Sequence, residues 1–156
     1  MGGSIGAWLI RAGHDVVLVD TDAAHAAAIR ENGLRITGPV DEFTVEAYCT
    51  DPLRLYPGFK TVLLCVKAHH TSVALNVIGQ LLHEDGFVVS VQNGLNERGI
   101  AGAVGPERTV GCFVNFGADV LEPGVIMRGN RGAVVVGELD GVRTDRISAV
   151  HALFQD

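Results

Sequence analysis

Three nearly continuous apolar runs constrain the fold of this chain more than any other feature of its sequence. They occupy residues 15–20, 61–66 and 87–91. A strand with one face in water alternates polar and apolar side chains, whereas these runs are apolar at successive positions. We therefore predict strands that are buried on both faces, as in parallel sheets that helices cover from both sides.

Helical patterns separate these runs. Residues 3–12 are followed by Gly13, and residues 22–31 begin at a capping aspartate and stop at Asn32-Gly33. Residues 71–82 carry an apolar stripe at i, i+4 spacing. Strands and helices in this order predict an α/β fold with a doubly wound, Rossmann-like and mostly parallel sheet.

The remaining segments extend this organisation. Residues 34–49, broken by Gly38-Pro39, predict a small hairpin inserted between two strand–helix units. Further helices are expected at residues 97–104 and 144–154, and further strands at residues 109–115, 125–128 and 133–136. We expect residues 1–156 to form one dinucleotide-binding domain.

The first residues resemble the end of a glycine-rich nucleotide-binding turn. Met1-Gly2-Gly3 leads directly into a helix, so we assign Gly2 to the third glycine of G-x-G-x-x-G, which lets helix and strand pack closely. The first strand and two earlier glycines are then expected upstream of Met1, and the domain is expected to be incomplete at its N-terminus. Asp20 ends the next strand at the position of the acidic residue that binds the ribose 2′-OH. The alternative is that Asp20 is a solvated residue at a strand end.

Composition excludes several classes of protein. Twelve Lys and Arg against 18 Asp and Glu give a net charge of −6 without a basic cluster, which argues against nucleic acid as a partner. The longest apolar runs are far shorter than a membrane helix, and the N-terminus lacks a signal-peptide pattern, so we expect a soluble cytoplasmic protein. Three cysteines without C-x-x-C spacing predict neither a disulfide framework nor a zinc site. His69 and His70 are adjacent and point to different helix faces, so we expect no metal site there either.

Two polar residues follow neighbouring predicted strands. Lys67 comes directly after the run at residues 61–66, and Asn93 comes shortly after the run at residues 87–91. Ligands bind at the carboxyl ends of parallel strands in doubly wound sheets, so both residues are candidates for a binding crevice. A solvated lysine and a plain Asn-Gly turn are the alternatives.

Several motifs in order resemble the N-terminal domain of the ketopantoate reductase family (2-dehydropantoate 2-reductase). The most specific steps are Val66-Lys67-Ala68 and Gln92-Asn93-Gly94-Leu95, each at a strand end. The resemblance also rests on Met1-Gly2-Gly3, Ala12-Gly13-His14-Asp15-Val16, Glu31-Asn32-Gly33-Leu34-Arg35-Ile36, Glu122-Pro123-Gly124-Val125 and Val136-Gly137-Glu138.

This resemblance implies a function and a set of contacts. It implies NADPH-dependent reduction of the 2-keto group of ketopantoate to pantoate, in pantothenate biosynthesis. Met1, Gly2 and Lys67 match cofactor-binding positions, and Asn93 matches the asparagine that contacts both the nicotinamide end and the substrate. Ala118 matches a backbone contact to the cofactor, with a one-residue shift to Gly117 left open.

Two departures from the family pattern modify these expectations. The family offers a basic residue for the NADPH 2′-phosphate where this chain has Val19-Asp20-Thr21-Asp22, and two carboxylates repel a phosphate, so NADH is favoured. The family's proton-donating lysine lies in a C-terminal helical domain, which we expect to be absent from this chain. We therefore name no catalytic residue and expect the 156-residue chain alone to be inactive.

Two other functions remain open. The chain is either a fragment of a related 2-keto-acid or 2-hydroxy-acid dehydrogenase, or a non-catalytic dinucleotide-binding module. A lysine-bearing helical domain in the adjoining reading frame separates the enzymes from the module. The sequence does not predict an oligomeric state.

Overall fold

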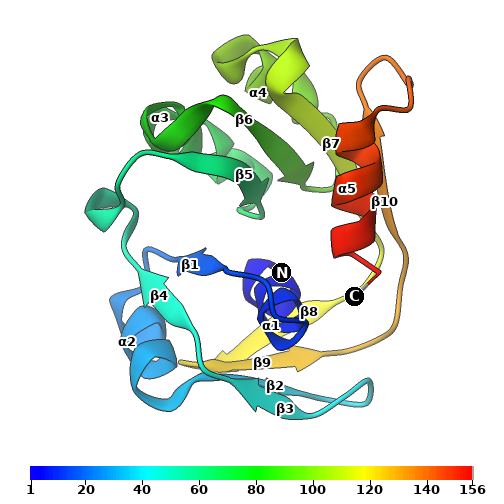
Figure 1. Cartoon of the computed structure of the whole chain (residues 1–156). Coiled ribbons are helices and arrows are strands. Elements are labelled where there is room, and N and C mark those ends of the chain that lie inside the picture. Colours follow the sequence, from blue (N-terminus) through cyan, green and yellow to red (C-terminus); the bar gives the residue numbers. More distant parts are fainter. Residues whose placement is uncertain (156) are drawn as a thin grey trace. The chain divides into compact units, whose positions relative to one another are not determined.

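The chain folds into two compact units, each built from two separated stretches of sequence. The computed structural model describes residues 1–155. Unit 1 comprises Met1–Leu55 and Phe116–Gly132, and unit 2 comprises Tyr56–Asn115 and Ala133–Gln155. The segment Phe116–Gly132 thus returns to the unit that contains the N-terminus (Figure 1).

Unit 1 holds two helices, one parallel pair of strands and one mixed sheet. Strands β1 and β4 pair in parallel, and the other four lie in the order β3-β2-β9-β8, in which only the β2–β9 pair is parallel. The elements are α1 (Gly2–Arg11), β1 (Val17–Val19), α2 (Ala23–Asn32), β2 (Leu34–Thr37), β3 (Phe43–Val45), β4 (Tyr48–Thr50), the 3-10 turn η1 (Pro52–Arg54), β8 (Ala118–Glu122) and β9 (Val125–Arg128).

Helix α1 packs against the mixed sheet at very short range. A Cβ atom added to Gly3 would lie 2.5 Å from the Ile126 Cδ1 atom, so the absence of a side chain permits this approach. Trp8 packs edge-to-face on Phe43, with ring centroids 5.1 Å apart, as expected for a packing residue. The core of unit 1 combines apolar residues of both helices and of β1, β2, β3, β4 and β9.

Unit 2 contains the regular part of the α/β fold. Its sheet has the order β10-β7-β6-β5, in which β5, β6 and β7 are parallel and β10 is antiparallel to β7. The elements are β5 (Phe59–Leu64), η2 (Ala68–His70), α3 (Thr71–Leu81), β6 (Leu82–Val91), α4 (Glu97–Val104), η3 (Pro106–Arg108), β7 (Thr109–Val114), β10 (Val134–Glu138) and α5 (Asp145–Leu153).

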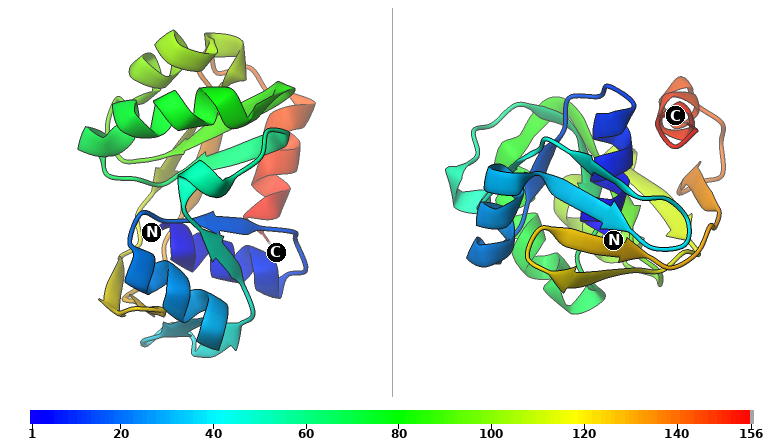
Figure 2. Two further views of the ribbon diagram at one scale, coloured as in Figure 1. Left: turned by 90° about the vertical axis from the view of Figure 1, so that its left-hand side faces the viewer. Right: turned by 90° about the horizontal axis from the view of Figure 1, so that it is seen from below.

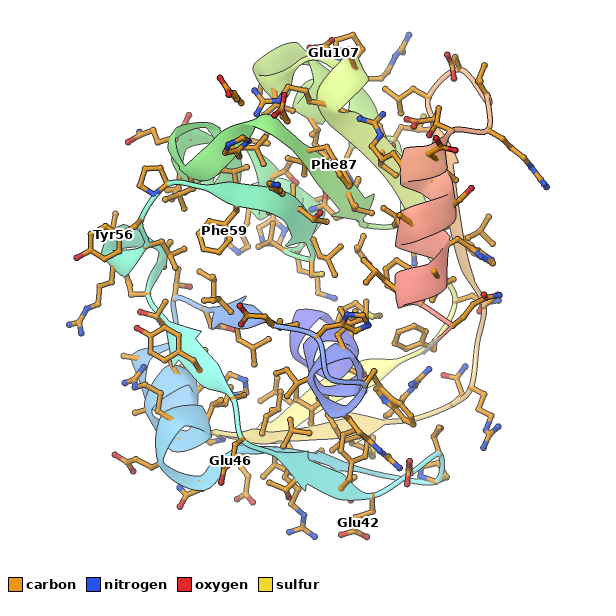
Figure 3. All side chains as sticks on the ribbon, viewed as in Figure 1. Glu42, Glu46, Tyr56, Phe59, Phe87 and Glu107 are labelled. Carbon is orange, nitrogen blue, oxygen red and sulfur yellow. The ribbon has the colours of Figure 1, made fainter. Side chains whose placement is uncertain are left out.

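Helices α3 and α4 lie side by side over the sheet of unit 2 (Figure 2). Their apolar residues Leu75, Ile78 and Ile100 form one core cluster with Leu64 and Val88 of the strands. Helix α5 packs on β10, where Arg146 forms an ion pair with Glu138. The Arg146 guanidinium also lies 5.2 Å from the centre of the Phe87 ring, which β6 presents on this side (Figure 3).

Most of the predicted elements are confirmed. The structure is an α/β fold with mostly parallel strand pairs, and the predicted helix at residues 97–104 and strand at residues 125–128 have the observed limits. Thr144 accepts a hydrogen bond from the Ile147 N–H and caps α5. In the described part of the chain, no helix is both long and apolar enough to cross a membrane.

Two expectations about strands are wrong. The run at residues 15–20 forms only the short strand β1, and Val19 is 47% exposed, because β1 pairs with β4 alone among the described residues. Strand β5 is also not buried on both faces, since Lys60 and Thr61 are exposed. The predicted hairpin at residues 34–49 is confirmed as β2 and β3, which join β9 and β8 in one sheet.

Candidate functional site

The first turn of α1 offers backbone N–H groups without a capping side chain. Met1 is the N-cap residue and makes no side-chain cap, although its carbonyl accepts a hydrogen bond from the Ile5 N–H at 3.2 Å. No acidic side chain lies in the first turn. The unpaired N–H groups and the helix dipole therefore favour an anion such as a phosphate at this end.

The close packing predicted for Gly2 belongs to Gly6. A Cβ atom on Gly6 would lie 2.4 Å from the Leu18 Cδ2 atom, so this glycine lets α1 approach β1. The assignment of Gly2 to the third glycine of the motif is therefore wrong. The spacing Gly3-Ser4-Ile5-Gly6 could have shown this, because G-x-x-G is the second half of G-x-G-x-x-G. Met1 then occupies the position of the first glycine.

Asp20 lies directly after β1 and takes part in two local interactions. Its backbone N–H donates to the Thr50 carbonyl at 3.1 Å, which extends the pairing with β4. Its Oδ1 atom accepts the Asp22 N–H at 2.9 Å. Asp22 in turn caps α2 by accepting from Ala24 N–H at 2.9 Å and His25 N–H at 3.0 Å. Asp20 is therefore an exposed strand-end residue with one oxygen bound in its own turn.

A cation lies near the same strand end. Arg30 of α2 donates to the Cys49 carbonyl at 2.7 Å, and Cys49 is paired with Leu18 of β1. Burial raises the pKa of the Cys49 thiol, the Asp20 carboxylate raises it further, and the Arg30 guanidinium lowers it. Asp20 and Arg30 thus both affect the pKa of Cys49 at this end of the β1–β4 pair. The sequence did not predict that these two residues lie near the same strand end.

Ala118 begins β8 and pairs with Arg128 of β9. The preceding residue is held firmly, since the Gly117 N–H donates to Asn130 Oδ1 at 2.8 Å and the Gly117 carbonyl accepts the Gly129 N–H at 3.0 Å. Met1, Gly2, Asp20 and Ala118 therefore all belong to unit 1.

The other two predicted residues lie at one edge of the sheet in unit 2. Strands β5 and β6 are parallel neighbours, with Leu64 opposite Ser90, so Lys67 and Asn93 both follow the carboxyl ends of adjacent strands. Both side chains are exposed. Lys67 has no ion pair within residues 1–155. Gly94 has φ +122°, a backbone conformation that favours glycine over other residues.

Asn93 also borders a shallow hollow of about 320 Å³ in unit 2. Glu97, Cys112, Val136 and Glu138 contribute to its wall. Burial raises the pKa of the Cys112 thiol to about 11, and the Glu97 carboxylate adds to this rise. Cys112 is therefore a neutral thiol near neutral pH, and the polar chemistry of this hollow rests on the amide and the carboxylates.

The adjacent histidines His69 and His70 are surface residues. His69 and His70 are exposed, and their rings lie 4.1 Å apart at a tilt of 50°. His83, Glu84 and Asp85 offer ligand atoms within 4.8 Å of one another, but they form a largely exposed cluster near the start of β6. Exposed acidic groups of this kind are common without an ion.

Comparison with known proteins gives a consistent set of similarities. Residues 1–141 match the family model described as ketopantoate reductase PanE/ApbA. A 2-dehydropantoate 2-reductase of Halobacterium salinarum is 28% identical over 99% of this chain and 51% of its own length. The corresponding protein of Pyrococcus horikoshii is 31% identical over 99% of this chain and 50% of its own length.

Solved structures are similar over the same extent. The crystal structure of 2-dehydropantoate 2-reductase from Geobacter metallireducens superimposes with a TM-score of 0.86 and 30% identity, over 97% of this chain and 50% of that one. The chain thus spans about half the length of the curated relatives that it matches.

Proposed function

The chain belongs to the ketopantoate reductase family, and from this membership we propose that it binds NAD(P)H for the reduction of a 2-keto acid such as ketopantoate. The observation that carries the proposal is the family match over residues 1–141, with Lys67 and Asn93 at the ends of adjacent parallel strands. The bound dinucleotide would supply the hydride. We also propose that residues 1–156 act as one dinucleotide-binding domain of a cytoplasmic enzyme.

The residues of each unit fit this cofactor by their chemistry. In unit 1, Met1 and Gly2 form the start of α1, which has neither a capping side chain nor an acidic residue in its first turn. Such a helix start suits a pyrophosphate. Ala118 offers its backbone. In unit 2, Lys67 offers an exposed ammonium group without an ion pair in the described part of the chain. Asn93 offers both a donor and an acceptor, which suits a carboxamide or the oxygen of a keto acid.

We propose a preference for NADH over NADPH. Asp20 has one carboxylate oxygen bound to the Asp22 N–H, which leaves the other for a ribose hydroxyl. The negative charge of Asp20 would repel a 2′-phosphate. Arg30 opposes this preference, because it lies near the same strand end, but its guanidinium already donates to the Cys49 carbonyl.

Titration with both dinucleotides tests this preference. We expect tighter binding of NADH, and Asp20→Arg should shift the ratio of the two affinities toward NADPH by roughly 10- to 100-fold. Arg30→Ala serves as the matched variant and should weaken NADPH binding if Arg30 contacts the 2′-phosphate. A wild-type preference for NADPH would contradict the proposed role of Asp20.

Activity assays separate the remaining functions. Since the chain spans about half the length of its relatives, we expect it to bind the cofactor without reducing ketopantoate. A panel of 2-keto acids, tested with the full reading frame, distinguishes a ketopantoate reductase from a dehydrogenase of another 2-hydroxy acid. A full-length protein that binds NADH but reduces none of them would be a non-catalytic binding module.

A further inference from the structure

We infer that Gln92 is a positioning residue that fixes the loop carrying Lys67 to the strand end carrying Asn93. Gln92 directly follows β6, and only 6% of it is exposed. Its functional consequence rests on the proposed function, because Lys67 and Asn93 are proposed cofactor and substrate contacts. The structural part of the inference stands on hydrogen bonds within unit 2.

One side-chain nitrogen of Gln92 holds two points of the neighbouring loop. Nε2 donates to the Val66 carbonyl at 2.6 Å and to the Thr71 Oγ1 atom at 2.9 Å. Val66 lies two residues after β5 and directly precedes Lys67, and Thr71 is the first residue of α3. The two hydrogen bonds therefore close the segment from Val66 to Thr71 at both of its ends.

The orientation of the Gln92 amide follows from its partners. A backbone carbonyl only accepts hydrogen bonds, so the atom facing Val66 is the nitrogen and not the oxygen. The opposite orientation would place Oε1 against the carbonyl oxygen. In the observed orientation Oε1 is buried without a hydrogen-bond partner among the described residues. An unpaired buried acceptor is unfavourable, and its presence here indicates that the two donated bonds determine the position of this side chain.

The loop held by Gln92 has few other restraints. Within it, the His70 N–H donates to the Lys67 carbonyl at 2.8 Å, which forms the short turn η2. Lys67, Ala68, His69 and His70 are all exposed, so burial does not hold them. Because Asn93 is the residue next to Gln92, one buried amide sets the position of both proposed contacts.

Substitution of Gln92 tests this inference on the 156-residue chain. Gln92→Leu removes both donated bonds. Gln92→Glu replaces the donor by a carboxyl group, which cannot donate a hydrogen bond when it is ionised. Gln80→Leu is the matched control, because the exposed Gln80 on α3 donates to the Asn76 carbonyl away from the loop. The readouts are hydrogen-exchange protection of the His70 amide and the dissociation constant for NADH.

We expect Gln92→Leu to lower protection of the His70 amide and to weaken NADH binding, each roughly tenfold. The Gly58 N–H, which donates to the Leu81 carbonyl at 2.9 Å, reports on the far end of α3 and should keep its protection. Gln80→Leu should change neither readout. If Gln92→Leu does not fold, Thr71→Val removes one of the two acceptors, and a smaller loss of protection is expected.

Gln92→Glu adds a pH signature that a general loss of packing would not give. A buried carboxyl facing a carbonyl has a raised pKa, and its protonated form can donate to Val66. Protection of the His70 amide in this variant should therefore recover on acidification from about pH 8 to about pH 5, relative to wild type at the same pH. Unchanged protection in Gln92→Leu, or absence of this recovery, would overturn the inference.

The two proposals fail differently. Protection of the His70 amide is measured without a cofactor, so a wild-type chain that does not bind NADH contradicts the proposed function and leaves the loop result intact. If protection falls but NADH binding stays at the wild-type level, Gln92 orders the loop without positioning a cofactor contact, which overturns the inference as stated.

Discussion

The contacts that stabilise the interior of unit 1 differ from those within unit 2. In unit 1, α1 approaches its strands closely because Gly3 and Gly6 lack side chains. The ion pair between Arg35 and Glu42 of the same unit is exposed.

Polar groups with little exposure connect distant segments in both units, and in unit 1 His25 of α2 accepts the Gly124 N–H at 3.2 Å. Unit 2 differs in having a largely buried ion pair. Gln92 joins β6 to the loop before α3, and Glu138 of β10 pairs with Arg146 of α5. Added volume beside α1 should therefore destabilise unit 1, and loss of a single polar group should destabilise the ion pair of unit 2. Gly86 of unit 2 is also closely packed, since a Cβ atom there would lie 2.6 Å from the Phe59 carbonyl oxygen.

The largest expected effect comes from adding one methyl group to unit 1. Gly6→Ala places a Cβ atom 2.4 Å from Leu18 Cδ2, so the buried Leu18 side chain must shift within the core of unit 1. We expect a loss of about 1–3 kcal/mol of unfolding free energy, the range for overpacked cores, measured by urea denaturation.

Gly79→Ala is the matched control for this substitution. Gly79 lies inside α3, and a Cβ atom there would meet nothing within 4 Å. Alanine should raise the unfolding free energy by up to about 1 kcal/mol, because it is the better helix former. Equal effects at the two glycines would show that the close approach of α1 and β1 at Gly6 does not exclude a side chain.

The next largest effect is expected from the ion pair of unit 2. The Glu138 side chain is 8% exposed and accepts hydrogen bonds from Arg146 and, at 2.6 Å, from the Thr144 hydroxyl. Glu138→Gln should lower the unfolding free energy by about 2 kcal/mol, as for hydrogen bonds to a charged group. Glu42→Gln, at the surface of unit 1, should change it by less than about 1 kcal/mol (Figure 3). Similar losses in urea denaturation would remove this contrast.

Acid should weaken the same contact of unit 2 by a smaller and graded amount. The hydrogen bond from Arg146 holds the pKa of Glu138 below its ordinary value of 4.5. This stabilisation is present above pH 4.5 and is lost as pH falls through the lowered pKa of the folded state. Urea denaturation from pH 7 downward should show a loss that Glu138→Gln lacks. A wild-type profile parallel to that of the variant would contradict the role of this pair.

The sequence predicted the local elements better than the pairings between them. The cap at Asp22 and the limits of α4 follow from neighbouring residues, and they were correct. The apolar stripe of α3 was correct only in part, since Ile78 and Leu81 are buried but Val73 is 65% exposed. Strands β4 and β8 were missed, since each forms by pairing with β1 or β9 and no local pattern predicts such a pairing. The apolar runs also predicted too much burial. Val19 lies in an apolar run but is 47% exposed, because β1 has no neighbouring strand besides β4 among the described residues.

In the candidate site, too, local features could be predicted from the sequence, whereas contacts between distant segments could not. Lys67 and Asn93 could be placed at one sheet edge, because parallel strands share a direction and each residue follows a strand. Gly6 was missed although its spacing from Gly3 was visible. The proximity of Arg30 to the end of β1, and the two hydrogen bonds of Gln92, join residues far apart in sequence, and no local pattern reports them.

Titration of the purified 156-residue chain with NADH, followed by nicotinamide fluorescence, tests the central claim most directly. Wild type should bind NADH saturably, and Lys67→Ala should weaken binding, because it removes an exposed ammonium group with no ion pair in the described residues. Lys60→Ala, a change at the other exposed lysine of unit 2, should leave binding unchanged. No saturable binding of either NADH or NADPH, or equal losses at the two lysines, would contradict the account.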